Sequence, residues 1–239
     1  MRITGHGPVT ISDYDKSTGL SDPEELDDAQ STLEITQSKS FNFRVDDIDK
    51  AQMNVSLMQS ATQDAGYQLS DVGDQYVAGI MASQAGHAVG SDESPKTFDG
   101  STDDVTDEIL AIKQALDEAN VPSVGRFLIL PPWFTVMLMK DSSVTNPAWS
   151  AVEGVMKNGQ LGKLYGFDLL QSNNVPNTSG TLYKIIAGTS RACTFADSVN
   201  GTEAYRPEKF FADALRGLHV YGAKVIDPSC LCVLTCNKS

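Results

Sequence analysis

The feature of this sequence that most constrains its fold is a long periodic segment, residues 46–84. Apolar or small residues recur in it three or four positions apart, at 48, 51, 55, 58, 61, 65, 69, 72, 76 and 80. This spacing is typical of one apolar stripe along an α-helix, and no proline interrupts it. Asp46 or Asp47 can cap the N-terminus. Such a helix would be roughly 50 Å long, far above the usual length, so we expect it to lie along a sheet as a spine.

The segment before this helix, residues 1–45, is predicted to form a projecting β-hairpin. RITGHGPVTI and STLEITQSKSFNFRV are rich in Thr, Ile, Val and Phe and partly alternate, as strands do. Between them lies a polar excursion with Gly19, Pro23 and a run of acidic residues. Because an isolated two-stranded hairpin is only marginally stable in water, we expect this one to rest on a neighbouring subunit.

Residues 101–197 are predicted to form a compact α/β unit. Ser101 or Thr102 is expected to cap a helix that ends before Asn120. The strand RFLIL, the helices WFTVMLMKD and AWSAVEGVMK, and the strands LYGFDLLQS and TLYKIIAG follow. From Thr202 onward the chain is predicted to form strands without a helix: TEAYRP, LRGLHVYGAKVI and CLCVLTC. The spine helix is the expected cover for the exposed face of this last section.

The most apolar run, residues 127–139, raises the question of a membrane segment. It is only thirteen residues long and contains Pro131 and Pro132. A helix needs about 20 apolar residues to cross about 30 Å of hydrocarbon. The run is therefore predicted to be a core strand followed by a core helix, and no membrane association is expected.

Charge is distributed unevenly along the chain. The net charge is -13, and residues 1–100 hold 6 basic against 17 acidic residues. Nucleic-acid binding through a phosphate-tracking groove needs clustered Lys and Arg, and the sequence contains no such cluster. The acidity is thus expected to form a solvated face.

No pattern of metal, cofactor or disulfide chemistry is evident. Three of the four cysteines lie in CLCVLTC, with no second pair at the spacing of a structural zinc site. We expect buried free thiols, no metal and no cofactor.

One motif leaves an enzymatic alternative open. Gly188-Thr189-Ser190-Arg191-Ala192 follows an apolar strand and resembles the nucleophile turn of an α/β hydrolase, with His219 as the partner base. The last glycine of that motif is replaced by Ala192, and a strand-end turn explains the segment better. We therefore expect no catalytic residues.

The chain resembles the major capsid proteins of tailed bacteriophages, which have the HK-97-type shell fold that encapsulins share. The resemblance covers almost the whole chain, and the order and spacing of its segments carry it. These segments are GPVTISDYDKSTGL, DAQSTLEITQSKSFNFRVDDIDKAQ, RFLILPPW, GFDLLQSNNVP, YKIIAG and AYRPEKFFADALRGLHVYGAKVIDP.

The resemblance implies an α+β subunit in three parts. Residues 1–45 correspond to the extended loop, which in the family reaches over an adjacent subunit. Residues 46–100 together with 198–239 correspond to the peripheral domain, a spine helix on a sheet. Residues 101–197 correspond to the axial domain, which surrounds the five- or six-fold axis. Members of the family usually have an N-terminal arm before the loop, so here the arm was removed or the sequence is partial.

The implied function is self-assembly into hexamers and pentamers of an icosahedral head in the virion. Such a head encloses double-stranded DNA without reading its sequence, and is assembled in the host cytoplasm. Portal, scaffolding or decoration proteins are further possible partners. We expect the acidic hairpin to pair with basic residues between subunits, and the candidate interface residues are Lys16, Asp22, Glu24, Glu25, Asp27, Asp28, Lys39 and Arg44. The alternatives are an encapsulin-like compartment shell and, more distantly, a tail or fibre component or the hydrolase described above.

Overall fold

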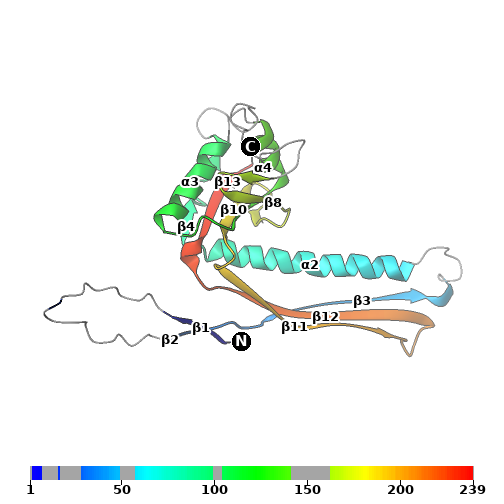
Figure 1. Cartoon of the computed structure of the whole chain (residues 1–239). Coiled ribbons are helices and arrows are strands. Elements are labelled where there is room, and N and C mark those ends of the chain that lie inside the picture. The colour runs from blue at the N-terminus through cyan, green and yellow to red at the C-terminus, as the bar shows by residue number, and fades with distance from the viewer. Residues whose placement is uncertain are drawn as a thin grey trace.

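The computed structural model describes residues 2–6, 16, 28–48, 57–98, 104–140 and 162–238. Figure 1 shows two regions, which we call the core unit and the arm. The core unit is an eight-stranded sheet with helices α3 and α4, and the arm is helix α2 running alongside a three-stranded sheet. A separate hairpin lies beyond one end of the arm. The α+β class predicted from the sequence is confirmed.

Helix α2 (Leu57–Ser83) is the described part of the predicted spine. The stripe residues from Met58 to Ile80 are all half-buried, whereas intervening positions such as Gln63 and Asp64 are exposed. The predicted stripe therefore faces the protein. At the other end of the segment, Asp47 and Ile48 are helical, and the Ile48 amide donates to Asp46 Oδ1 (3.0 Å), as expected of a cap. Residues 49–56 lie outside the described residues.

The sheet of the arm has the order β11-β12-β3 and is antiparallel throughout. Its strands are β11 (Cys193–Tyr205), β12 (Ala212–Val225) and β3 (Gln37–Asp46). Tyr221 of β12 is fully buried and packs edge-on against Tyr76 of α2, with ring centroids 5.5 Å apart. Because side chains alternate along a strand, this contact identifies the face of the sheet that α2 covers.

The core unit is built on an eight-stranded sheet with the order β4-β13-β10-β6-β8-β7, in which β5 also pairs with β13 and β9 with β10. The strands are β4 (His87–Val89), β5 (Lys96–Thr97), β6 (Arg126–Leu130), β7 (Lys163–Leu164), β8 (Phe167–Gln171), β9 (Asn177–Thr178), β10 (Leu182–Thr189) and β13 (Leu231–Asn237). The predicted strands RFLIL, LYGFDLLQS and TLYKIIAG are confirmed as β6, β8 and β10.

Two helices belong to this unit. Helix α3 (Val105–Glu118) has Asp104 at its N-cap, so the expected cap at Ser101 or Thr102 is wrong. Capping residues are common throughout this polar stretch, and the sequence alone does not select among them. Helix α4 (Pro132–Lys140) begins at a proline, as predicted, because proline is well tolerated in a first turn. The third predicted helix, near residues 147–158, lies outside the described residues.

The helices and the sheet enclose one apolar core. Phe134 is fully buried and makes edge-on contacts with Phe98 and Trp133, with ring centroids 5.4 and 5.6 Å away. The fully buried side chains around it include Ile109, Ile112, Leu116, Leu128, Leu130, Leu138, Ile185, Ile186 and Leu234. The apolar run at 127–139 is therefore core, as predicted.

The last strand pairs differently from the sequence expectation. CLCVLTC was grouped with the strands before it, under the spine helix, but β13 pairs with β10, with Leu234 opposite Ile185. Residues Leu231 to Cys236 are all buried, so both faces of this strand are covered. Such a strand has no alternation of apolar and polar residues to indicate which sheet it joins.

Candidate assembly interface

The hairpin of β1 (Arg2–His6) and β2 (Asp28–Thr32) is attached to the arm at one fixed place. Leu33, directly after β2, is buried. The Lys224 Nζ of β12 donates a hydrogen bond to the Thr32 carbonyl oxygen (2.9 Å). The base of the hairpin is therefore joined to the sheet by a hydrogen bond, next to a buried apolar side chain.

A glycine makes this attachment possible. A Cβ atom at Gly222 of β12 would collide with the Glu34 carbonyl oxygen and approach the Ile35 Cα to 3.0 Å. The connection between β2 and β3 thus crosses the sheet directly over Gly222, where only glycine leaves room for a backbone. Gly222 is a residue that sets the direction in which the hairpin leaves the arm.

The predicted interface residues fall in different places. Lys16 is exposed in a turn, and Asp28 is the first residue of β2, opposite His6. Lys39 and Arg44 are both exposed on β3, opposite His219 and Ala214. Asp22, Glu24, Glu25 and Asp27 lie outside the described residues. The role of these residues between subunits therefore stays a prediction.

Arg44 has a partner in its own subunit. Its guanidinium carbon lies 3.7 Å from the centroid of the Phe210 ring, in the turn between β11 and β12. A stacked guanidinium still presents its edge to a carboxylate. The stacking therefore fixes the direction of this charge.

The same turn is supported by a second network. Arg206 forms ion pairs with Asp213 (Nε to Oδ1, 2.9 Å) and Asp47 (Nη2 to Oδ2, 2.8 Å). The hydrogen bond that Arg206 donates to Asp213 and the charge of Asp47 raise the pKa of the Arg206 guanidinium. The Asp47 amide also donates to the Phe211 carbonyl oxygen (3.0 Å). The end of β3 and the β11–β12 turn are thereby joined into one surface at the end of the arm.

The sequence analysis missed the aromatic residues of this turn. Phe211 is 87% exposed and Phe210 is 49% exposed. The available signal was two consecutive phenylalanines directly after the polar turn Arg206-Pro207-Glu208-Lys209, where no apolar periodicity requires them. Cross-strand polar pairs lie further along the sheet, including Arg216 with Glu203 (2.6 Å) and Tyr205 with Asn42 (3.1 Å).

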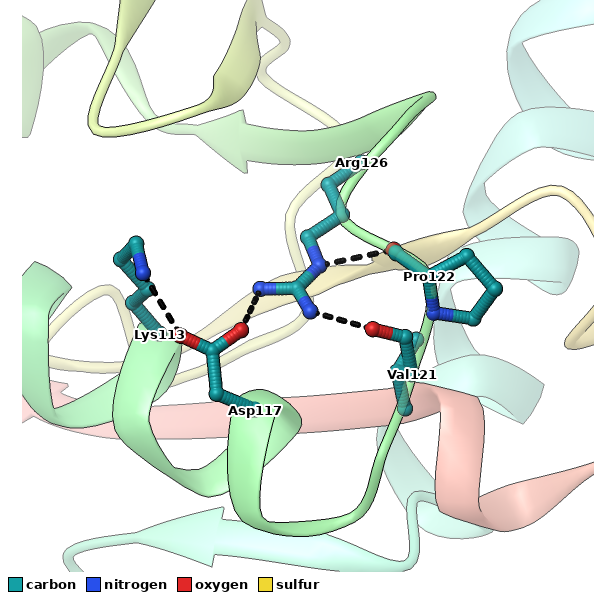
Figure 2. Close-up of polar contacts among 5 residues, drawn as sticks. All are labelled: Lys113, Asp117, Val121, Pro122 and Arg126. Carbon is teal, nitrogen blue, oxygen red and sulfur yellow. Dashed lines mark hydrogen bonds and ion pairs between the residues drawn. The ribbon is translucent and has the colours of Figure 1, made fainter.

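A rigid turn is also present in the core unit (Figure 2). The Arg126 side chain is buried, and its Nη1 pairs with Asp117 Oδ1 (2.7 Å) while its Nε donates to the Pro122 carbonyl oxygen (3.0 Å). Lys113 Nζ contacts the other carboxylate oxygen of Asp117 (2.6 Å). Hydrogen bonds from Lys113 and then Arg126 lower the pKa of Asp117. The network joins the end of α3 to the start of β6.

The cysteines are free thiols, as predicted; those at 230, 232 and 236 are buried, whereas Cys193 is only half-buried, unlike the prediction. Burial raises the pKa of Cys232 and of Cys236 to about 12. Both thiols are therefore neutral and unreactive at ordinary pH. Among the described residues, no three His, Cys, Asp or Glu side chains are grouped closely enough to bind a metal ion.

The Ser190–His219 alternative is wrong as a catalytic pair within one subunit. Ser190 lies in the turn before Cys193, which pairs with Val225 at one end of β12. His219 lies six positions further along β12, which corresponds to about 20 Å of strand. Nucleophile and base need to approach within about 3 Å.

No helix in the described part of the chain is both long and apolar enough to cross a bilayer.

Comparison with known proteins identifies the family. A family model described as phage capsid protein matches residues 30–234, which is most of the chain. The chain belongs to this family. No curated protein sequence matches the chain significantly.

Solved structures agree with this assignment to the capsid protein family. A structure from Mycobacterium phage Che8 is 29% identical, with a TM-score of 0.80 over 98% of this chain and 83% of the other. The capsid of Cyanophage P-SCSP1u is 16% identical, with a TM-score of 0.78 over 100% and 84%. A virus-like particle from Pyrococcus furiosus is 15% identical, with a TM-score of 0.59 over 98% and 85%.

These comparisons confirm the resemblance stated from the sequence. The protein is a structural subunit of a phage capsid and has the HK-97-type shell fold. A shell is made of repeated copies, so the surfaces that matter are those that meet other subunits. The hairpin base around Gly222 and the β11–β12 turn are two candidates for such surfaces whose construction the structure describes.

Proposed function

We propose that this chain is the major capsid protein of a tailed double-stranded DNA phage. It self-assembles into hexamers and pentamers of an icosahedral head. The observation that carries the proposal is the combination of the family match with a likeness, at 29% identity over 98% of the chain, to a structure from a phage. Assembly takes place in the host cytoplasm, and portal, scaffolding or decoration proteins complete the particle.

The three-part division of the subunit is part of this proposal. Residues 1–45 act as the extended loop, 46–100 with 198–239 as the peripheral domain, and 101–197 as the axial domain. The pairing of β3 with β12 means that the loop is continuous with the peripheral sheet at its C-terminal end. The pairing of β13 with β10 likewise means that the last strand crosses from the peripheral to the axial part.

Contacts between subunits are proposed to use the candidate interface residues. The acidic residues Asp22, Glu24, Glu25, Asp27 and Asp28 of one copy pair with basic residues of the next. Lys39 and Arg44 are suitable because both are exposed on β3. Each exposed pair contributes only about 0.2–1 kcal/mol, so the pairs act through their number. Lys16, in the same loop, adds a basic contact.

Microscopy of the expressed protein tests the proposal directly. Purified wild-type protein should form closed shells of uniform size, and analytical ultracentrifugation should show one large species. A compact monomer that persists at high concentration would contradict the proposal. Open rods would instead favour a tail or fibre component.

A deletion of residues 15–29 tests the role of the acidic segment. The variant should fold, with a circular dichroism spectrum close to that of the wild type. It should not form shells. Charge reversal at Lys39 and Arg44 together is the matched second variant, and it should weaken assembly in the same direction. Normal shells from the deletion would refute the role given to the segment.

An encapsulin-like compartment is the second candidate. The likeness to the Pyrococcus furiosus particle favours it, although its TM-score of 0.59 is below the 0.80 of the phage structure. A compartment encloses protein cargo, whereas a phage head encloses DNA. Particles purified from infected cells should therefore contain double-stranded DNA, and protein cargo in place of DNA would favour the compartment.

A further inference from the structure

A cavity lies where three parts of the subunit meet, and we call it the junction cavity. Helix α2, which Figure 1 shows between the core unit and the sheet of the arm, forms one wall. Strands β6 and β8 of the core unit form the second wall, and β11 and β12 of the arm form the third. The cavity is open to solvent and has a volume of about 590 Å³. Sites for small molecules typically measure about 300–1,000 Å³, so the junction cavity has the size of such a site.

The lining of the junction cavity is mainly apolar. Leu170 and Phe195, from opposite walls, are 51% and 47% exposed, so part of this apolar surface is in contact with water. Moving such surface from water into contact with an apolar ligand is favourable. The apolar lining comes from all three walls and consists of Val77, Ala78, Met81, Ile129, Leu170 and Phe195.

Gly73 leaves room in the helical wall of the cavity. The residue is buried, yet a Cβ atom added to it would meet no atom within 4 Å. Because Gly73 also lines the cavity, the space beside it is cavity space. A longer side chain at this position would therefore extend into the junction cavity without a collision at its Cβ atom.

The charged groups at the cavity favour a cation. Asp74 on α2 and Asp197 on β11 both line it, both are exposed, and neither forms an ion pair with a described residue. Among the described lining residues there is no Lys or Arg, and His219 is the one other titratable group. Lys39 lies opposite His219 on β3 but does not line the cavity. A ligand that complements these walls has an apolar body and one positive charge, whereas an anion would be repelled by the two carboxylates.

Two features of the arm wall are typical of a binding site. The pairing of β11 with β12 shifts register between Asp197 and Val199, and bulges of this kind are common beside functional sites. Next to this wall, the Tyr221 ring contacts the Phe195 and His219 rings, with centroids 5.9 and 4.8 Å apart. The Tyr221 hydroxyl group is buried and has no hydrogen-bond partner among the described residues. Buried hydroxyl groups are rarely left in this state, so the wall has a polar group in reserve for a bound molecule.

We propose that the junction cavity binds a small amphipathic cation. Its alkyl or aryl body packs against α2, β8 and β11, and its ammonium group lies near Asp74 and Asp197. Such a ligand contacts the core unit and the arm at the same time, so its binding stabilises one placement of the two regions relative to each other. All the residues that line the site come from one subunit. The proposal is therefore independent of shell assembly, and its failure would leave the capsid function intact.

Three indole derivatives test the requirement for charge. Tryptamine, tryptophol and indole-3-propionate share one ring system and are cationic, neutral and anionic at neutral pH. Equilibrium dialysis against the unassembled subunit should show saturable binding of tryptamine, with an affinity roughly threefold or more above that of tryptophol. Indole-3-propionate should bind most weakly. Equal binding of the three compounds, or no saturable binding of tryptamine, would overturn the proposal.

Two leucine substitutions on the same helix test the position of the site. Gly73→Leu should abolish tryptamine binding because the new side chain occupies the cavity. Gly66→Leu is the matched control, since an added Cβ atom there also meets nothing within 4 Å but Gly66 does not line the cavity. Both variants should give the circular dichroism spectrum of the wild type. Tryptamine binding that survives in Gly73→Leu, or that is lost equally in both variants, would overturn the proposal.

The Asp74→Asn, Asp197→Asn double variant tests the carboxylates separately from the shape of the cavity. Its affinity for tryptamine should fall to that of tryptophol, while its affinity for tryptophol should stay unchanged. This selective loss distinguishes a contact with the ammonium group from a merely structural role, which would weaken both compounds alike. An unchanged preference for tryptamine, or an equal loss of both compounds, would show that the carboxylates do not bind the cation and would overturn the proposal.

Discussion

The core unit and the arm of this subunit are built with very different amounts of internal contact. In the core unit, β13 is buried along six consecutive residues and α3 and α4 supply fully buried side chains to the core. In the arm, the described side chains of α2 from Met58 to Val72 are at most half-buried. The core unit encloses an apolar core, whereas the arm leaves apolar side chains such as Phe211 exposed.

This difference explains how one chain can both fold and assemble. A subunit that was incomplete everywhere would not fold before assembly, and one that was complete everywhere would have no reason to assemble. We propose that the stability of the single subunit comes mainly from the core unit, and that surfaces for other copies lie on the arm. Changes in the core unit should thus act on folding, and changes in the arm on assembly.

The largest expected effect is on the core. Phe134→Ala should lower the free energy of unfolding by about 3–5 kcal/mol, because it leaves a cavity in a fully buried aromatic cluster. Tyr67→Ala, on α2 where the ring is 71% exposed, is the matched aromatic substitution in the arm and should stay within about 0.5 kcal/mol. Urea denaturation of the unassembled subunit checks both. Equal losses at the two positions would remove the distinction between the regions.

Alkaline pH should weaken the core unit next. The pKa of Cys232 and of Cys236 is raised by burial to about 12, so the folded subunit keeps both thiols neutral while the unfolded chain ionises them. Their contribution is complete below the unfolded pKa and falls as pH rises from about 9 toward 12. By pH 10, ionisation of the two thiols in the unfolded chain should lower the free energy of unfolding by about 3 kcal/mol. The Cys232→Val, Cys236→Val double variant should lose less stability at alkaline pH. If its free energy of unfolding falls with pH as steeply as that of the wild type, the thiols are not the cause.

Gly222→Ala should affect the arm by a smaller amount. The new methyl group displaces the connection at Glu34 and Ile35, at a cost of about 1–3 kcal/mol, and it should redirect the hairpin. Shell yield should fall more than subunit stability, and proteolysis after Leu33 should be faster. Gly201→Ala is the control, because no atom lies within 4 Å of its added Cβ. Matching shell yields for the two variants would show that the crossing at Gly222 does not position the hairpin.

The smallest effect is expected at the turn between α3 and β6. Arg126→Met should cost about 1–2 kcal/mol, since the Val121 and Pro122 carbonyl groups lose a buried donor. The lowered pKa of Asp117 adds stability above the unfolded pKa that is lost as pH falls through the folded value. Stability of the variant should therefore depend less on pH below about 4. Lys113→Met, which removes only an exposed pair, should change stability by about 0.5 kcal/mol or less. Acid titrations of wild type and both variants check this order.

Periodicity predicted the main elements of the fold, but not the short strands β4, β5 and β9. The α2 stripe, the Pro131-Pro132 break between β6 and α4, and the strand β10 follow from spacing and from proline chemistry. The partner of β13 did not follow, because a strand buried on both faces carries no alternation. The start of α3 was misplaced for a local reason, since several capping residues precede it.

The interface was less predictable than the fold. The charged residues at Lys39 and Arg44 were found because charge is visible in a sequence. The aromatic residues of the β11–β12 turn were missed because Phe210 and Phe211 resemble core residues, and only the structure shows them exposed. Gly222 was missed for a similar reason, since the backbone that crosses it comes from residues far away in the sequence.

Hydrogen–deuterium exchange on unassembled and assembled protein is the most direct test of the contrast between the two regions. In the free subunit, β6, β10 and β13 should already be strongly protected, and assembly should leave their exchange unchanged. By contrast, α2 and the β11–β12 turn should exchange quickly in the free subunit and become protected in the shell. If the arm is as protected in the free subunit as in the shell, it is complete without other copies and the account is wrong.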